Sequence, residues 1–189
     1  MKSEVIKMKS VRSVFLFIFC IVSNMLFQTT SLALEKDTHY FLNEKIVVGT
    51  NLDSYLKMNL GLANGIKEEF NNRKILEWIK IGGKTEDEPI YTRSFNHFHD
   101  PLKPWNSAGF KGIFKSSVIW AQDQGWISSQ FGGDWSWKKA RDSFYKGLTG
   151  RTKIDRDIDL SITFQALGQI IHLVQDSSVP AHVRNDTHV

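Results

Sequence analysis

The residues best suited to chemistry lie near the end of the chain. Gly168, His172 and Asp176 follow one another at intervals of four residues, so a helix through them would carry them in one row. Pro180 ends such a helix, and His182 comes two residues later. Two imidazoles and a carboxylate held this close together are ligands that Zn²⁺ prefers. The spacing therefore predicts a metal site, although a His-x-x-x-Asp pair is also compatible with a plain hydrogen bond along a helix.

The positions of the other histidines favour the metal interpretation. The chain has 6 histidines, which sit at three separated places beside carboxylates or Asn. Histidines that merely fill a surface would not avoid the long middle of the chain in this way. The six are His39, His97, His99, His172, His182 and His188.

Helical periodicity predicts the elements that position these residues. The final helix carries an apolar stripe, and Gly168 beside it is expected to let another helix come close. The stripe consists of Leu160, Phe164, Leu167, Ile171 and Val174. Earlier helices are expected over 39–47, 52–62, 73–81, 116–124 and 137–148. No strand pattern persists, so the sequence predicts an all-α fold.

Three stretches between these helices are interpreted from their turn residues. Gly82 and Gly83 are expected to stop the third helix. The acidic loop 82–89 that they open is most simply a solvated turn. Segment 95–101 is predicted to be extended, with His97 and His99 on opposite faces, so that at most one of them faces a shared site. The tryptophans of 102–135 are most simply packing residues, and a rim that grips an apolar substrate is the lesser alternative.

Residues 1–33 are interpreted as a signal peptide, followed by one domain over 34–189. A positive amino-terminal region, a short apolar run and Ser31-Leu32-Ala33 are typical of a secreted or periplasmic protein. The apolar run is short for a membrane span, so no transmembrane segment is expected in the mature chain. The formal net charge of +4 falls to +1 without these residues, which gives no support for a general nucleic-acid-binding patch. Cleavage after Ala33 would also remove the only cysteine and leave Leu34 as the first residue.

Together these motifs resemble the zinc-dependent phospholipase C/P1 nuclease family. The resemblance rests on His172-x-x-x-Asp176-x-x-x-Pro180-x-His182, on His97-Phe98-His99-Asp100-Pro101, on Asp87 five residues after Gly82, and on Thr38-His39. It implies an all-α domain that binds up to three Zn²⁺ ions.

The resemblance also implies a role for each residue. His97, His172 and Asp176 would hold one ion, and Asp176 would bridge to a second ion bound by His39 and the free amino group of Leu34. His182 would begin a third site, whose His-x-x-x-Glu/Asp partner pair would lie further along. Because His188 is followed by no such partner, the chain is expected to be a C-terminally incomplete piece or a shortened relative. Asp87 would be a ligand or the catalytic base.

The function expected on this basis is a secreted zinc phosphodiesterase that uses metal-activated water. A phospholipid head group is the preferred substrate, and a single-stranded nucleic acid is the alternative, as in the nuclease branch. A catalytically inactive zinc-binding remnant is the other possibility. No stable protein partner is implied.

Overall fold

The structure is a computed structural model that describes residues 34–186, without the side chains of residues 127–129. The predicted signal peptide and His188 therefore lie outside the described residues. The fold is built around the longest helix, α9 (Lys153–Asp176), which spans 24 residues. Thr152 caps its start by accepting a hydrogen bond from the backbone N–H of Asp155.

Helices make up most of the described chain, which confirms that the fold class is mainly helical. The earlier helices are α2 (Lys36–Gly49), α3 (Leu52–Leu60), α4 (Ile75–Thr85) and α5 (Ile90–Arg93). The later ones are α6 (Ser117–Gln122), α7 (Gly125–Gln130), α8 (Trp137–Thr149), α9 and α10 (Pro180–Arg184). The expectation of no strand is wrong at one place, where β1 (Glu69–Phe70) and β2 (Arg73–Lys74) pair antiparallel just before α4.

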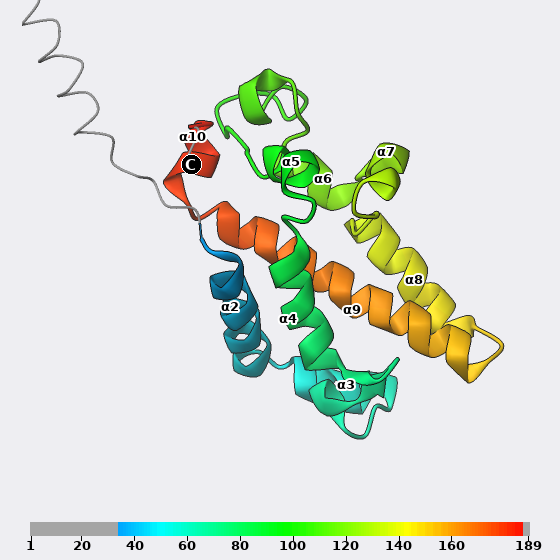
Figure 1. Cartoon of the computed structure of the whole chain (residues 1–189). Helices are drawn as coiled ribbons and strands as arrows, with labels where there is room; N and C mark the ends of the chain where they lie inside the picture. The colour runs from blue at the N-terminus through cyan, green and yellow to red at the C-terminus, as the bar shows by residue number, and fades with distance from the viewer. Residues whose placement is uncertain (1–33, 187–189) are drawn as a thin grey trace, which may run out of the picture. The chain divides into compact units, whose positions relative to one another are not determined.

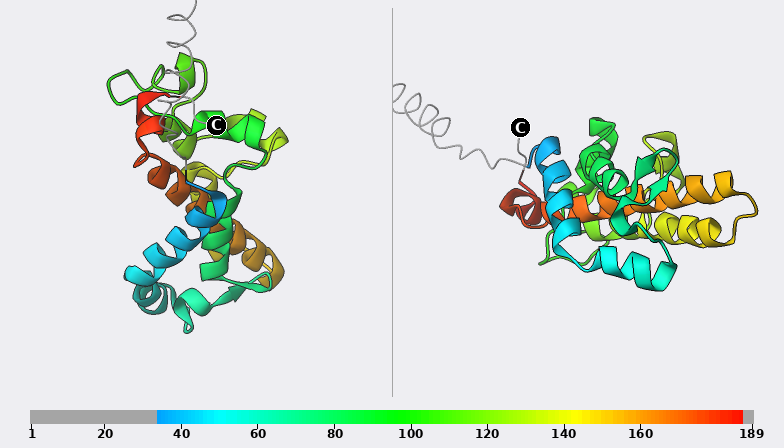
Figure 2. Two further views of the ribbon diagram at one scale, coloured as in Figure 1. Left: turned by 60° about the vertical axis from the view of Figure 1, so that its left-hand side comes forward. Right: turned by 90° about the horizontal axis from the view of Figure 1, so that it is seen from below.

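The central helix α9 packs against α4 along one part of its length and against α8 along another (Figures 1 and 2). Helix α2 lies beside α4 and reaches α9 near its C-terminal end. A Cβ atom added to Gly168 would lie 2.0 Å from the carbonyl oxygen of Ile79 on α4. This geometry confirms the prediction that Gly168 admits a neighbouring helix.

The hydrophobic core surrounds the first half of α9. Its buried members are Val47, Leu56, Ile66, Phe70, Ile75, Ile79, Leu160 and Phe164. Leu167 and Ile171 pack partly against this cluster, but Val174 is 67% exposed, so the predicted apolar stripe ends before it. The last turns of α9 are instead occupied by buried polar residues, which leaves that end of the helix for the candidate site.

Helix α4 continues through the two glycines that were expected to end it. Gly82 and Gly83 are both buried, and the helix ends only at Thr85. A Cβ added to Gly82 would lie 2.1 Å from the carbonyl oxygen of Gln165, and one added to Gly83 would lie 2.4 Å from the side-chain nitrogen of Asn43. The glycines therefore serve close packing against α9 and α2, a tertiary effect that local propensity does not capture.

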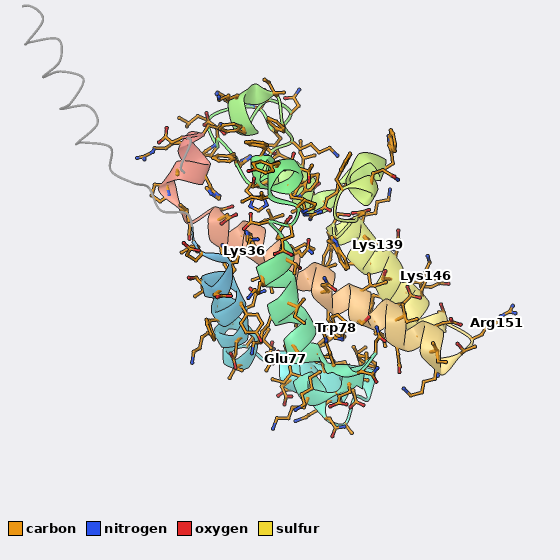
Figure 3. The ribbon with its side chains drawn as sticks, in the orientation of Figure 1. Lys36, Glu77, Trp78, Lys139, Lys146 and Arg151 are labelled. Carbon is orange, nitrogen blue, oxygen red and sulfur yellow. The ribbon has the colours of Figure 1, made fainter. Side chains whose placement is uncertain are left out.

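Polar contacts also fix α2 against α4. The hydroxyl of Tyr40 donates to Glu77, which Figure 3 labels on α4, at 2.9 Å. Lys80 lies over the Tyr40 ring and forms ion pairs with Glu77 and Glu44. On the other side of the structure, Figure 3 places Lys139 and Lys146 along α8.

Within residues 34–186, none of the helices combines the length and the apolar character needed to cross a bilayer.

Candidate metal centre

A small cavity of about 120 Å³ at the C-terminal end of α9 gathers all six side chains singled out from the sequence. They are His39, Asp87, His97, His172, Asp176 and His182. Leu34 also lines the cavity, and three phenylalanines, Phe95, Phe98 and Phe110, complete much of its wall. The residues thus meet as the sequence-based hypothesis requires, although they come from separate parts of the chain.

Asp176 lies at the centre of the cluster and contacts four imidazoles. Its Oδ2 lies 2.7 Å from Nδ1 of His97 and 3.2 Å from Nε2 of His172. The same oxygen lies 3.4 Å from Nδ1 of His182, and Oδ1 lies 3.4 Å from Nε2 of His39. The carboxylate is only 2% exposed, so these imidazoles take the place of water around it.

Asp87 faces the same cavity from the segment after α4. Its Oδ1 lies 3.5 Å from Nδ1 of His97, and its Oδ2 lies 3.8 Å from Nε2 of His172. Two groups of three residues could each hold an ion, because the three ligand atoms within a group all lie within 4.8 Å of one another. The first group is His39, His172 and Asp176, and the second is Asp87, His97 and His172. His172 belongs to both sets, whereas the family resemblance assigned the shared role to Asp176.

These separations fit the size of a zinc ion. With Zn–N and Zn–O bonds of about 2.0–2.1 Å, tetrahedral ligand atoms lie about 3.3 Å from one another. Most of the contacts around Asp176 and Asp87 fall between 3.2 and 3.8 Å. The donor set, imidazole nitrogen with carboxylate oxygen and no thiolate, is also one that zinc accepts.

The orientation of two rings gives a second test of the fit. Nδ1 of His39 donates to the side-chain oxygen of Gln175 at 2.6 Å, and Nδ1 of His172 donates to the carbonyl oxygen of Gly83 at 2.7 Å. Each ring therefore directs its Nε2 to the cavity, and this is the nitrogen whose lone pair a bound metal would use. Asn43 extends this support, because it accepts from Nε2 of Gln175 at 2.8 Å.

The local structure carrying two of these histidines differs from the sequence-based expectation. His97 follows a 3-10 turn, Ser94–Asn96, with a helical backbone rather than an extended one. His182 lies in the short helix α10, whose first residue is Pro180, rather than in a loop. Both segments turn back toward the end of α9, which brings the rings onto Asp176.

Only one histidine of the 97–99 pair reaches the cavity. The backbone N–H of His99 donates to the carbonyl oxygen of His182 at 3.0 Å, which joins the two segments. Its ring is not among the residues that line the cavity. The expectation that at most one of the two faces the site is thus met, with His97 as the one.

The pKa shifts show that the buried carboxylates and imidazoles of the cluster stabilise one another's charges. Burial by itself raises the pKa of Asp176, but the imidazoles of His172, His182, His39 and His97 outweigh it and hold this pKa far below its usual range. Burial by itself lowers the pKa of His97, but the carboxylates of Glu86 and Asp176 raise it to about 10.

Sequence reasoning missed one carboxylate, Glu86, which it placed in a solvated turn. Glu86 is fully buried and accepts hydrogen bonds from Trp120 Nε1 at 2.8 Å and Arg93 Nε at 2.9 Å. Burial by itself raises the pKa of Glu86, but the charges of His97 and Arg93 lower it to about 2. These partners lie outside the acidic run itself, 7 residues away for Arg93 and 34 for Trp120, so the run is typical of a surface turn when taken alone.

An aromatic cavity of about 610 Å³ lies on the other side of the segment that carries His97. Its lining includes Tyr91, Phe114, Trp120, Trp126 and Phe131. Phe114 stacks on Phe95, a wall residue of the metal cavity, with ring centroids 4.8 Å apart. Packing alone explains Trp120, which is buried, but Trp126 is 77% exposed, in disagreement with the simple packing interpretation of the tryptophans.

The fold and site define a helical protein with a buried His/Asp cluster whose ligand atoms are close enough together to hold a metal ion. Comparison with known proteins finds no family, no curated protein and no solved structure that matches the chain.

Proposed function

We propose that the protein is a zinc-dependent phosphodiesterase, with a phospholipase C-like activity as the preferred form. The observation that carries the proposal is the convergence of four imidazoles and two carboxylates, from separate segments, on a cavity of about 120 Å³. Zinc, when bound, lowers the pKa of a coordinated water toward about 7 and polarises a phosphoryl oxygen. This chemistry suits hydrolysis of a phosphoric ester without a strong protein base.

Different residues of the cluster would bind different ions. His39, His172 and Asp176 would hold one ion, and Asp87 and His97 would hold another close to it, because the single Nε2 lone pair of His172 can serve only one of the two. His182 adds a further ligand beside Asp176.

Two more residues would act at the edge of the cluster. Asp87 is the more exposed of the two carboxylates, at 18% against 2%, so it is placed to accept a proton from an entering water. Leu34 lines the cavity, so cleavage after Ala33 would add its amino group to the ligands.

The charge of the two cavities favours a phospholipid over a nucleic acid. Among the described residues that line them, Lys115 is the only Lys or Arg. Its amino group already donates to the carbonyl oxygens of Asp123 and Gln124. A protein that tracks a polynucleotide needs several cations for its phosphates, whereas one lipid phosphate can be held by the metal centre alone. The mostly apolar lining of the adjoining aromatic cavity also suits a lipid.

The deciding experiment measures zinc content and hydrolysis on the same purified protein. We expect about two or three zinc ions per chain, with hydrolysis of phosphatidylcholine that stops with a chelator and returns with Zn²⁺. Turnover that persists in the chelator would refute the mechanism. Cleavage of single-stranded DNA in place of phosphatidylcholine would support the nuclease alternative. Bound zinc without turnover of either substrate would identify an inactive zinc-binding protein.

A further inference from the structure

Glu86 is a buried carboxylate beside the metal centre that the proposed ligand set does not use. It directly follows helix α4 and directly precedes Asp87, yet the two side chains diverge. Asp87 lines the cavity, whereas Glu86 points into the protein and is fully buried. An ionised group in such a place requires specific partners, because burial of an unpaired charge is very costly.

Both carboxylate oxygens of Glu86 are held in place. Oε1 accepts from the indole N–H of Trp120 at 2.8 Å, and Oε2 accepts from Nε of Arg93 at 2.9 Å. The guanidinium is itself fixed, because it donates to Gln169 at 2.8 Å and to the carbonyl oxygen of Gly133 at 2.9 Å. Glu86 is therefore a rigid anion whose position is set by several other segments.

This anion faces the outer nitrogen of a candidate ligand. Nε2 of His97 lies 3.5 Å from Oε2 of Glu86, while Nδ1 of the same ring faces Asp176 and Asp87. Nε2 is buried and makes no hydrogen bond within the described part of the chain, so the ion pair with Glu86 is its polar contact. A metal bound to Nδ1 leaves the ring with one proton, on Nε2, directed at Glu86.

Two of the other three cavity histidines, His39 and His172, have a comparable arrangement with weaker acceptors. Nδ1 of His39 donates to an amide oxygen of Gln175, and Nδ1 of His172 donates to the backbone carbonyl of Gly83. Both acceptors are neutral, whereas Glu86 is ionised. A charged acceptor makes a stronger hydrogen bond and a more basic imidazole.

We propose that Glu86 is a positioning residue for the metal centre: it accepts the Nε2 proton of His97 and so holds Nδ1 of that ring toward the ion. The inference rests on the proposed metal site and extends it to a residue outside the ligand set. The rival explanation is that Glu86 only balances the buried charge of Arg93 and contributes stability.

A pair of variants of the full chain separates the two roles. Glu86→Gln keeps the size of the side chain but removes its charge. Trp120→Phe removes only the hydrogen bond to Oε1, on the side of Glu86 that faces away from His97. Circular dichroism establishes that each variant is folded, and competition with a chromogenic chelator gives its affinity for Zn²⁺.

We expect Glu86→Gln to bind Zn²⁺ about 10- to 100-fold more weakly than the wild type, as is usual when a carboxylate behind a metal-bound histidine is lost. Trp120→Phe should stay within about threefold of the wild type, because Arg93 still holds Oε2, the oxygen nearest His97. Folded Glu86→Gln with wild-type zinc affinity, or an equal loss of affinity in both variants, would overturn the positioning role. If the wild type itself binds no zinc, the proposed function fails, and the inference fails with it.

A measurement on the wild type keeps the inference testable even if Glu86→Gln does not fold. In the protein loaded with ¹¹³Cd²⁺, scalar coupling between cadmium and the imidazole ¹⁵N nuclei identifies the coordinating nitrogen of each ring. We expect coupling to Nδ1 of His97 and a downfield, slowly exchanging proton on its Nε2. Coupling to Nε2 of His97 would contradict the proposal, because that nitrogen could then not donate to Glu86.

Discussion

Gly82 and Gly168 meet where helices α4 and α9 touch backbone to backbone. A Cβ atom on Gly168 would lie 3.0 Å from Cα of Gly82 and 2.0 Å from the carbonyl oxygen of Ile79. This close approach also brings His172, one turn beyond Gly168, within 2.7 Å of the carbonyl oxygen of Gly83. The glycine contact therefore sets both the packing of the two helices and the orientation of one candidate ligand.

The first prediction concerns this helix contact. Gly168→Ala should lower the free energy of unfolding by about 3 kcal/mol, because the cost of overpacking exceeds the gain of about 1 kcal/mol in helix propensity. Chemical denaturation measures the change. Gly49→Ala is the matched control, because nothing lies within 4 Å of a Cβ at this position on α2. Equal stability of the two variants would mean that the helices are not this close in solution.

The second prediction concerns the carboxylate at the centre of the cluster. Asp176→Asn removes the charge that contacts four imidazoles, so most of the bound zinc should be lost and hydrolysis should fall by more than about 100-fold. Metal analysis and the phosphatidylcholine assay measure both effects. Asp123→Asn is the control, because Asp123 is half-exposed and pairs with Lys138 at 3.5 Å. Full zinc content in Asp176→Asn would remove this residue from the ligand set.

The third prediction concerns Asn43, which is fully buried between three elements. Its amide donates to the carbonyl oxygens of Ile79 and Gly168, and its oxygen accepts from Gln175. Asn43→Ala should lower the free energy of unfolding by about 3 kcal/mol, because buried polar groups lose their partners. It should also weaken zinc binding, since Gln175 holds the ring of His39.

Asn59→Ala provides the comparison for Asn43→Ala, because Asn59 is exposed and donates only to the carbonyl oxygen of Tyr55. Urea denaturation of the two variants measures the difference in stability. A change below about 0.5 kcal/mol in Asn43→Ala, the range of ordinary surface substitutions, would argue against the network.

The fourth prediction concerns the choice of metal. Imidazole ligands favour zinc, whereas Mg²⁺ prefers an all-oxygen shell, so Zn²⁺ should raise the melting temperature and Mg²⁺ should not. Zinc at 100 times its Kd stabilises a folded protein by about 2.7 kcal/mol. Thermal unfolding of metal-free protein with each ion measures the shift. In His39→Ala the zinc-dependent shift should shrink, and an undiminished shift would place the ion elsewhere.

The sequence was informative where one helix carries the pattern. The spacing of Gly168, His172 and Asp176 predicted both the close helix contact and one face of the site, because helical geometry alone relates these positions. The placement of His39 and His97 among the histidines only hinted at a shared site, and their roles and that of Asp87 came from the family resemblance, since no local pattern relates residues on separate elements.

The errors have a common physical origin in tertiary contacts. Gly82 and Gly83 have poor helix propensity, but their packing against α9 and α2 keeps them helical. Glu86 has the composition of a surface acid, but Arg93 and Trp120 balance its burial. Arg93, seven residues later, is the cation that pairs with Glu86, but spacing alone does not distinguish it from Lys84 or Lys80, or a buried pair from two solvated charges.

The cluster joins a residue of the first described helix to one in the last. A growing polypeptide that has not yet released α9 and α10 from the ribosome lacks His172, Asp176 and His182, and therefore half of the six candidate ligand residues. The full set of coordinating atoms therefore exists only once the chain has been made as far as α10.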